Sequence, residues 1–135
     1  MNQSFMILFI LSLIQYRMDI HMHPCNHIWG NVILYIHHIL NIYIYFGGFL
    51  LNPLYHFIVV VLTMMHWILN DNKCFLTEIV NDICYPEYSE YSEYSEYKQF
   101  NDFSKMLGLQ DNYPHISYYY LLMIMIYDYY LIVNN

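Results

Sequence analysis

Long apolar runs alternate with short polar stretches along this chain. Four runs, at 5–16, 32–51, 54–69 and 116–133, consist mainly of Ile, Leu, Phe, Val, Met and Tyr. A helix needs about 20 such residues to cross a bilayer core of about 30 Å. The last three runs therefore predict membrane-spanning helices. The first is too short to cross unaided, which leaves three alternatives: it tilts into one leaflet, lies at the interface, or is an extension that the fold does not need.

The residues at the ends of the runs mark where the spans stop. Asn52-Pro53 predicts a turn, because the residue before a proline is pushed out of the helical region. So short a connection makes 32–51 and 54–69 an antiparallel hairpin. Trp67 and the tyrosines at both ends of 116–133 occupy positions typical of interfacial aromatic belts.

The segment 70–115 is the most polar part of the chain. Phe75, Ile79 and Ile83 recur at every fourth position, which predicts a short amphipathic helix on the membrane surface that ends at Tyr85-Pro86. Apolar residues within 100–109 indicate a second surface helix. Between them, 87–97 is the triplet repeat EYSEYSEYSEY, which has four like charges and no apolar partner and so predicts solvated low-complexity sequence.

Together these elements predict an all-α integral membrane bundle of three to four spans with short cytoplasmic surface helices. Its parts are an N-terminal anchor and His-rich loop at 1–31, a transmembrane hairpin at 32–69, a cytoplasmic loop at 70–115 and a C-terminal transmembrane helix at 116–135. Composition agrees, because 59% of the residues are hydrophobic and 11% are charged, against about 45–50% and about 25% in soluble domains.

The charges suggest an orientation and exclude one class of partner. A net charge of −7 excludes the basic footprint of a nucleic-acid-binding protein. All four basic residues lie in the polar stretches 17–31 and 70–115; they are Arg17, Lys73, Lys98 and Lys105. Both stretches fall on the same side of the membrane, so the positive-inside rule predicts that they are cytoplasmic.

Polar side chains on the predicted spans are the main candidates for chemistry. They are His37 and His38 on the first hairpin helix, and His56, Thr63, His66 and Asn70 on one stripe of the second. The expected role is interhelical hydrogen bonding that fixes packing. The alternative is ligation of haem or a metal in the bundle core by the histidines of this set.

Asp128 is the one acid within a predicted span and lies about four residues from its end. Its carboxylate could snorkel to the interface. A third alternative is a proton or ion conduit lined by His56, Thr63, His66 and Asp128. The chain has no Gly-x-Ser-x-Gly sequence and no other sign of a nucleophile, so no enzymatic activity is predicted.

A second cluster of potential ligands precedes the hairpin. It consists of His21, His23, Cys25 and His27. Zinc sites usually draw their ligands from two separated pairs, so loop histidines without a ligand role are favoured and no metal is predicted. Three cysteines, an odd number, argue against a disulfide scaffold, and Cys74 and Cys84 are expected to be ordinary apolar thiols.

A longer pattern surrounds the end of the second hairpin helix. It begins with Gly47-Gly48-Phe49-Leu50-Leu51 and His56 and continues as His66-Trp67-x-x-Asn70-x-Asn72-x-Cys74-x-Leu76-Thr77-Glu78. The pattern resembles that of uncharacterised small polytopic membrane proteins of large DNA viruses of eukaryotes and, more distantly, of bacterial four-span membrane proteins with Cys-x-Leu-Thr. The resemblance covers about residues 33–83. It implies a three- or four-span core and no activity.

A structural corner accounts for the residues of this motif. His66 and Trp67 would anchor the cytoplasmic end of the span, and Asn70 and Asn72 would bond the last free carbonyls of the helix. Thr77 would cap the surface helix through its hydroxyl. We therefore expect a non-enzymatic structural or assembly component of a membrane, with no cofactor, whose partners are the lipid bilayer and other membrane or virion proteins.

Overall fold

The structure is a computed structural model that describes residues 3–70, 73–85 and 116–134. These residues form helices and no strand: α1 Gln3–Met22, α2 Ile28–Leu50, α3 Pro53–Leu69, α4 Phe75–Cys84 and α6 Ile116–Asn134. The all-α prediction is confirmed for this part of the chain. The repeat at 87–97, the second surface helix expected within 100–109 and Asn72 lie outside the described residues.

Three helices, α1, α2 and α6, are long and apolar enough to cross a membrane, judged by length and composition. The apolar helix α3 has 17 residues, which extend about 25 Å at a rise of about 1.5 Å per residue. This length is at the lower limit for a span. The described part of the chain thus contains three candidate spans and one shorter apolar helix.

The first helix is longer than the apolar run predicts. It comprises 20 residues and extends to Met22, so the polar loop before α2 shrinks to 23–27. The sequence predicts a loop from Arg17 onward because charged residues beside an apolar run usually leave the membrane. Here Gln15 and Asp19 are buried against the protein instead, so the helix continues through them.

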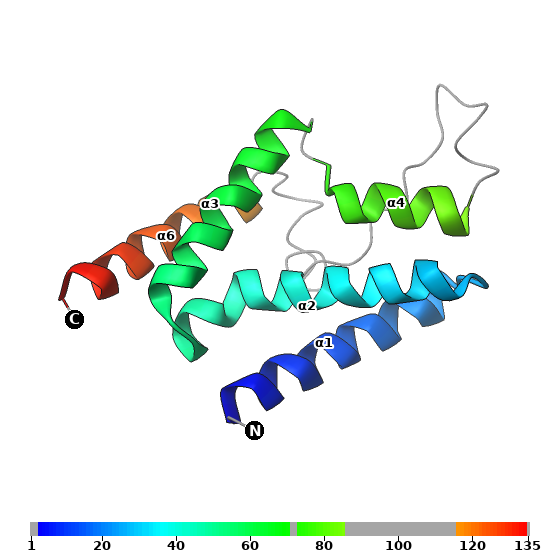
Figure 1. Ribbon diagram of the computed structural model, residues 1–135, viewed down its shortest axis with the longest axis horizontal. Helices are drawn as coiled ribbons and strands as arrows, with labels where there is room; N and C mark the ends of the chain where they lie inside the picture. The colour runs from blue at the N-terminus through cyan, green and yellow to red at the C-terminus, as the bar shows by residue number, and fades with distance from the viewer. Residues whose placement is uncertain (1–2, 71–72, 86–115, 135) are drawn as a thin grey trace.

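At the centre of the fold, α2 packs against α1, α3, α4 and α6 (Figure 1). The helices α1 and α4 lie along different sides of α2, while α3 leaves its C-terminal end at a wide angle and packs against α6 (Figure 1). The antiparallel hairpin of α2 and α3 is not confirmed, because the two helices diverge from their shared turn.

Two clusters form the core: Ile44, Val60, Leu121 and Ile124 join α2, α3 and α6, and Leu34 and Val80 join α2 to α4.

The turn predicted at Asn52-Pro53 lies between α2 and α3. The side-chain oxygen of Asn52 accepts hydrogen bonds from the backbone N–H groups of Leu54, at 2.9 Å, and Tyr55, at 3.4 Å. Pro53 is the first residue of α3, where the missing N–H would have no helical partner in any case. Only Leu51 and Asn52 separate the two helices.

The amphipathic helix α4 packs one side on α2, while Phe75 of the predicted apolar stripe is 56% exposed. Val80 is fully buried and belongs to the same cluster as Leu34 of α2. Cys74, just before α4, lies beside His37, and Cys84 at its other end lies beside Gly30. Therefore α4 runs antiparallel to the first half of α2 (Figure 1).

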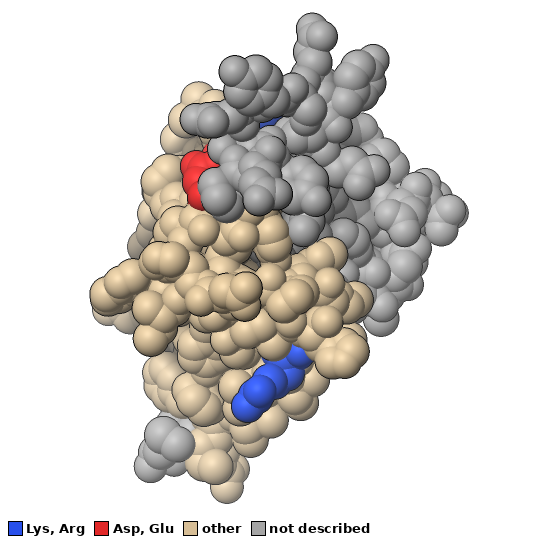
Figure 2. Space-filling model, turned by 90° about the vertical axis from the view of Figure 1, so that its right-hand side faces the viewer, with Lys and Arg blue, Asp and Glu red and all other residues tan. Residues whose placement is uncertain are grey.

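The outward faces of the apolar helices expose large hydrophobic side chains. Examples are Phe5, Ile58, Met123 and Ile126, which are between 46% and 68% exposed. On the face drawn in Figure 2, charged side chains occupy little of the described surface. Such extensive apolar surface is unusual on a soluble monomer and suits helices surrounded by lipid.

Truncation of the residue at the α2–α4 contact should destabilise the protein. Leu34 has no exposed surface, so Leu34→Ala should lower the free energy of unfolding by about 2–5 kcal/mol through the cavity that it leaves. Leu40→Ala is the matched control on the same helix, because Leu40 is 40% exposed. Denaturant unfolding in detergent, followed by circular dichroism, measures both. Equal losses would contradict the packing described here.

Candidate functional site

Two apolar helices carry one acid each, and both acids are buried. Asp19 on α1 and Asp128 on α6 have no exposed surface. Each ends a buried stripe with intervals of four, three and four residues: Leu8, Ser12, Gln15 and Asp19 on α1, and Ser117, Leu121, Ile124 and Asp128 on α6. A carboxylate within a membrane is unfavourable unless it is paired, which draws attention to the partner of each.

Asp128 pairs with His56 of α3. Its Oδ2 lies 2.6 Å from His56 Nδ1, and both side chains are almost completely buried. An added Cβ at Gly48 of α2 would lie 2.8 Å from His56 Nδ1 and would overlap Asp128 Oδ1, and one at Gly47 would lie 2.6 Å from His56 Cδ2. The two glycines therefore give the His56–Asp128 pair the space it occupies against α2.

The second ring nitrogen of His56 contacts the backbone of α2. Its Nε2 lies 3.0 Å from the carbonyl oxygen of Tyr43 and 3.1 Å from that of Ile44. Carbonyl oxygens only accept hydrogen bonds, so Nε2 must carry a proton. A second proton must lie between Nδ1 and the Asp128 carboxylate, because a nitrogen and an oxygen in so short a contact share a hydrogen. The pair is then neutral overall, whether the second proton resides on nitrogen or on oxygen. One neutral unit thus connects α2, α3 and α6.

Asp19 lies at ion-pair distance from His38 of α2. The Nε2 of His38 lies 3.0 Å from Asp19 Oδ2, and neither side chain is exposed. One turn before Asp19 on α1 and one turn after His38 on α2, the side-chain amide of Gln15 donates to Asn41 Oδ1 at 3.2 Å. Two buried polar contacts therefore join α1 to α2, at a place where the sequence predicts a solvated loop for Asp19.

A single buried stripe of α2 extends to both pairs. It contains His38, Asn41, Tyr45 and Gly48 at intervals of three, four and three residues. The carbonyl of Tyr45 accepts a hydrogen bond of 3.0 Å from the hydroxyl of Tyr120 on α6. His38 and Gly48 are about 15 Å apart along the helix axis at a rise of about 1.5 Å per residue. The two histidine–aspartate pairs are thus separate sites on one helix.

The polar stripe predicted on α3 does not act as one unit. Only His56 is buried, and the hydroxyl of Thr63 donates to the carbonyl of Val59 in its own helix at 2.9 Å. His66 accepts the backbone N–H of Phe75 at 3.1 Å through its Nε2. His37, which is buried on α2, has its Nδ1 3.5 Å from the Sγ of Cys74. Each histidine of the proposed haem set therefore has a different neighbour.

The motif after α3 forms a corner between α3 and α4. The backbone N–H of Asn70 donates to the carbonyl of His66 at 2.9 Å, and its side-chain amide donates to Lys73 O at 3.0 Å and to Glu78 Oε2 at 2.8 Å. Trp67 packs edge-on against Tyr118 of α6 with ring centroids 5.6 Å apart. These contacts agree with a local structural role for this part of the motif.

Thr77 does not cap α4 as the sequence predicts. The N-cap residue is Cys74, which makes no capping bond through its side chain. Thr77 is the third residue of the helix and is buried, while Leu76 before it is half-buried. The helix starts three residues earlier than a cap at Thr77 would place it, and the backbone N–H of its first residue, Phe75, donates to His66.

The candidate metal cluster before α2 is not assembled. Cys25 forms a disulfide with Cys84, so the prediction that Cys84 is an apolar thiol is wrong, while Cys74 is in no disulfide. His21 and His27 are exposed. Within the described ranges, no group of three or more His, Cys, Asp and Glu side chains is arranged to hold a metal ion. The two bridged cysteines are 59 residues apart, and only the folded chain brings them together.

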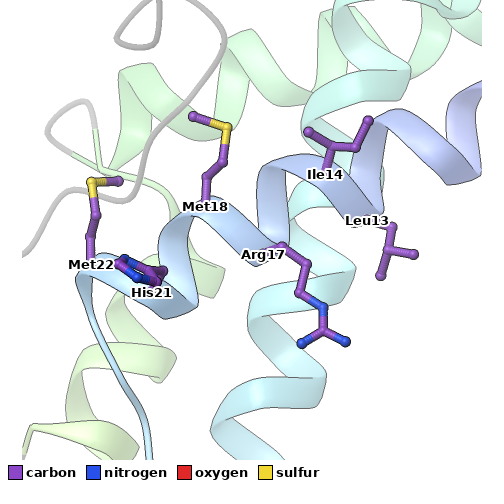
Figure 3. Close-up of a pocket in the computed structure, with 6 residues that line it drawn as sticks. All are labelled: Leu13, Ile14, Arg17, Met18, His21 and Met22. Carbon is purple, nitrogen blue, oxygen red and sulfur yellow. The ribbon is translucent and has the colours of Figure 1, made fainter.

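The outer face of α1 borders a shallow groove of about 600 Å³. It is lined by Leu13, Ile14, Arg17, Met18, His21 and Met22. Figure 3 shows these side chains projecting from one helix, with Arg17 extending away from the sulfur atoms of Met18 and Met22. These residues lie on a different face from the stripe that packs on α2, and the groove has the character of an open helix surface.

No protein-family model, curated protein or solved structure matches this chain. The chemistry of the histidine–aspartate pairs therefore has to be inferred from their own geometry.

A double-mutant cycle tests the His56–Asp128 pair. His56→Leu or Asp128→Leu alone should destabilise the protein, because each leaves a buried polar partner unpaired. The double substitution should cost less than the sum of the two, with a coupling free energy above the average of about 0.6 kcal/mol for interhelical hydrogen bonds in membranes. Unfolding in mixed micelles measures these values, and strict additivity would refute the pairing.

Two further variants refine that test. Asp128→Asn should be milder than Asp128→Leu, because an amide N–H can still donate to His56 Nδ1. Tyr129→Leu is the matched control on α6, since Tyr129 is 62% exposed and should be insensitive.

Proposed function

We propose that the chain is a non-enzymatic structural or assembly component of a membrane, with a multi-pass helical fold. The observation that carries this proposal is the use of the buried acids. Asp19 and Asp128 are each placed against a histidine of a neighbouring helix, and His56 uses both of its ring nitrogens in contacts within the protein. A residue that acts on a ligand keeps an atom directed at that ligand, whereas His56 directs both nitrogens at other helices.

The same geometry supports a role of these pairs in helix recognition. Hydrophobic burial gives little selectivity between helices in lipid, because the lipid tails are as apolar as the side chains. Polar pairs then decide which helices associate. The Asp19–His38 pair favours the packing of α1 on α2, and the His56–Asp128 pair favours the packing of α6 on α3.

We propose bilayer lipids and other membrane proteins as the partners. The exposed side chains of α1, α3 and α6 are mainly apolar, which suits contacts of both kinds. The resemblance of the His66–Glu78 motif to small membrane proteins of large DNA viruses makes a virion or host membrane the proposed location.

A haem- or metal-binding redox protein is the second candidate. The contact of 3.5 Å between His37 Nδ1 and Cys74 Sγ favours it, because imidazole and thiolate are common metal ligands. His56 weighs against it as a haem ligand, because an iron would have to displace either Asp128 or the two carbonyl oxygens.

An absorbance spectrum and metal analysis of the protein purified in mild detergent separate the two candidates. The structural proposal expects no Soret band and no stoichiometric metal in a well-folded sample. A Soret band, or one metal ion per chain, would make the redox candidate the leading one.

Substitution of the corner histidine gives a second test. His66→Ala should lower the free energy of unfolding by about 0.5–1.5 kcal/mol, because the N–H of Phe75 loses its acceptor. His27→Ala is the matched control, since His27 is exposed and makes no side-chain capping bond at the start of α2. Loss of a bound chromophore from the His66→Ala protein, with its fold intact, would contradict the structural proposal.

A further inference from the structure

The disulfide between Cys25 and Cys84 joins two segments at one end of the bundle. Cys25 lies in the 23–27 loop, Cys84 is the last residue of α4, and their Cα atoms are 5.2 Å apart. Gly30 of α2 lies directly beneath the bond. An added Cβ there would be 2.7 Å from Cys25 Sγ and would overlap Cys84 Sγ. The surface of α2 therefore leaves room for two sulfur atoms at this point.

Other contacts hold the loop against the end of α4 and against α2. The hydroxyl of Tyr85 donates to the carbonyl of Pro24 at 3.3 Å, and the side chain of Asn31 donates to the carbonyl of Cys25 at 2.9 Å. Burial, and then the negative charge of Asp19, raise the pKa of Tyr85, so its hydroxyl remains a donor at neutral pH. The bond thus closes an arrangement that non-covalent contacts also favour.

The chemistry of this bond indicates a compartment. Disulfides form and persist in oxidising compartments, whereas the glutathione and thioredoxin systems keep cytosolic thiols reduced. To form the bond, the thiols of Cys25 and Cys84 give two electrons and two protons to the disulfide of a thiol oxidoreductase, which leaves as a dithiol. That enzyme has to reach this end of the bundle.

We propose that the 23–27 loop and the end of α4 face an oxidising compartment, the lumen of the secretory pathway or the cell exterior, where the disulfide clamps α4 to the start of α2. The segments before α1 and after α6 are then cytosolic. This inference rests on the multi-pass membrane fold proposed above but not on the structural role, because it concerns only the side of the membrane and the state of two thiols.

This orientation is the opposite of the one that the basic residues predict. The positive-inside rule describes a bias in the number of Lys and Arg residues, and here it rests on four residues in the whole chain. Arg17 is one of these four, and it lies within α1 rather than in a loop. A disulfide does not persist in a reducing compartment. We therefore give this bond greater weight than the number of basic residues.

Glycosylation mapping of the full chain in microsomes tests the side of the membrane. Phe103→Thr makes Asn101 an Asn-x-Thr acceptor between α4 and α6, and Phe103→Ala is the matched control without an acceptor. A second acceptor in a tail added after Asn135 reports on the other side. We expect an endoglycosidase-sensitive mass increase for Phe103→Thr alone. Modification of the tail but not of Asn101 would overturn the proposal.

Thiol counting tests the clamp in the same membranes. In a Cys74→Ser protein, denatured and treated with a maleimide mass tag, we expect no tag before reduction and two tags after it. Cys25→Ser in that background should give one tag without reduction, which shows that the reagent reaches Cys84. Two tags before reduction would show free thiols and refute the clamp, even if Asn101 is glycosylated.

Discussion

A carboxylate within an apolar helix has to be neutralised by a group that the fold can bring to it, and the His56–Asp128 pair meets this requirement. It fixes α6 against α3, and it also fixes both against α2, because the other nitrogen of His56 binds the carbonyls of Tyr43 and Ile44. The close approach needs a helix surface without side chains, which Gly47 and Gly48 supply. Three helices are therefore positioned by one neutral unit and two glycines.

The second pair applies the same principle at the other end of the same buried stripe of α2. Asp19 lies against His38, and the stripe of α1 that carries Asp19 has the same spacing as the stripe of α6 that carries Asp128. The two pairs differ in how far apart their members lie in the sequence. Asp19 and His38 belong to consecutive helices, whereas His56 and Asp128 are 72 residues apart. One pair therefore stabilises a local contact, and the other connects distant parts of the chain.

Much of the helical pattern could be predicted from the sequence. Apolar run lengths identify α2 and α6 as candidate spans, Asn52-Pro53 identifies the turn, and the spacing of Phe75, Ile79 and Ile83 identifies the amphipathic α4. These features are local, because they depend on residues within a few turns of one another. The corner after α3 is also local, although the side-chain amide of Asn70 bonds Lys73 and Glu78 there rather than the last carbonyls of α3 as predicted.

The contacts between helices could not be predicted in this way. The charge of Asp19 indicates a loop unless its partner His38 is known, and Asp128 has the same ambiguity between the interface and the interior. The partner of Cys84 lies 59 residues away. One signal was available in the sequence: Ser12 and Gln15 on α1, and Ser117 on α6, lie at helical spacing from these acids, so each acid shares a helix face with another polar residue. That regularity marks Asp19 and Asp128 as inward-facing.

The long separation of His56 and Asp128 has a consequence for how the protein is made. At about 5–20 residues per second, the ribosome takes about 4–14 s to add the 72 residues between them. During this time α3 has been synthesised and its imidazole has no carboxylate to meet, while α1 and α2 already contain both members of their own pair. His56 therefore remains without its partner until α6 has been synthesised. Synthesis of α6 supplies the carboxylate that connects α3 to this distant part of the chain.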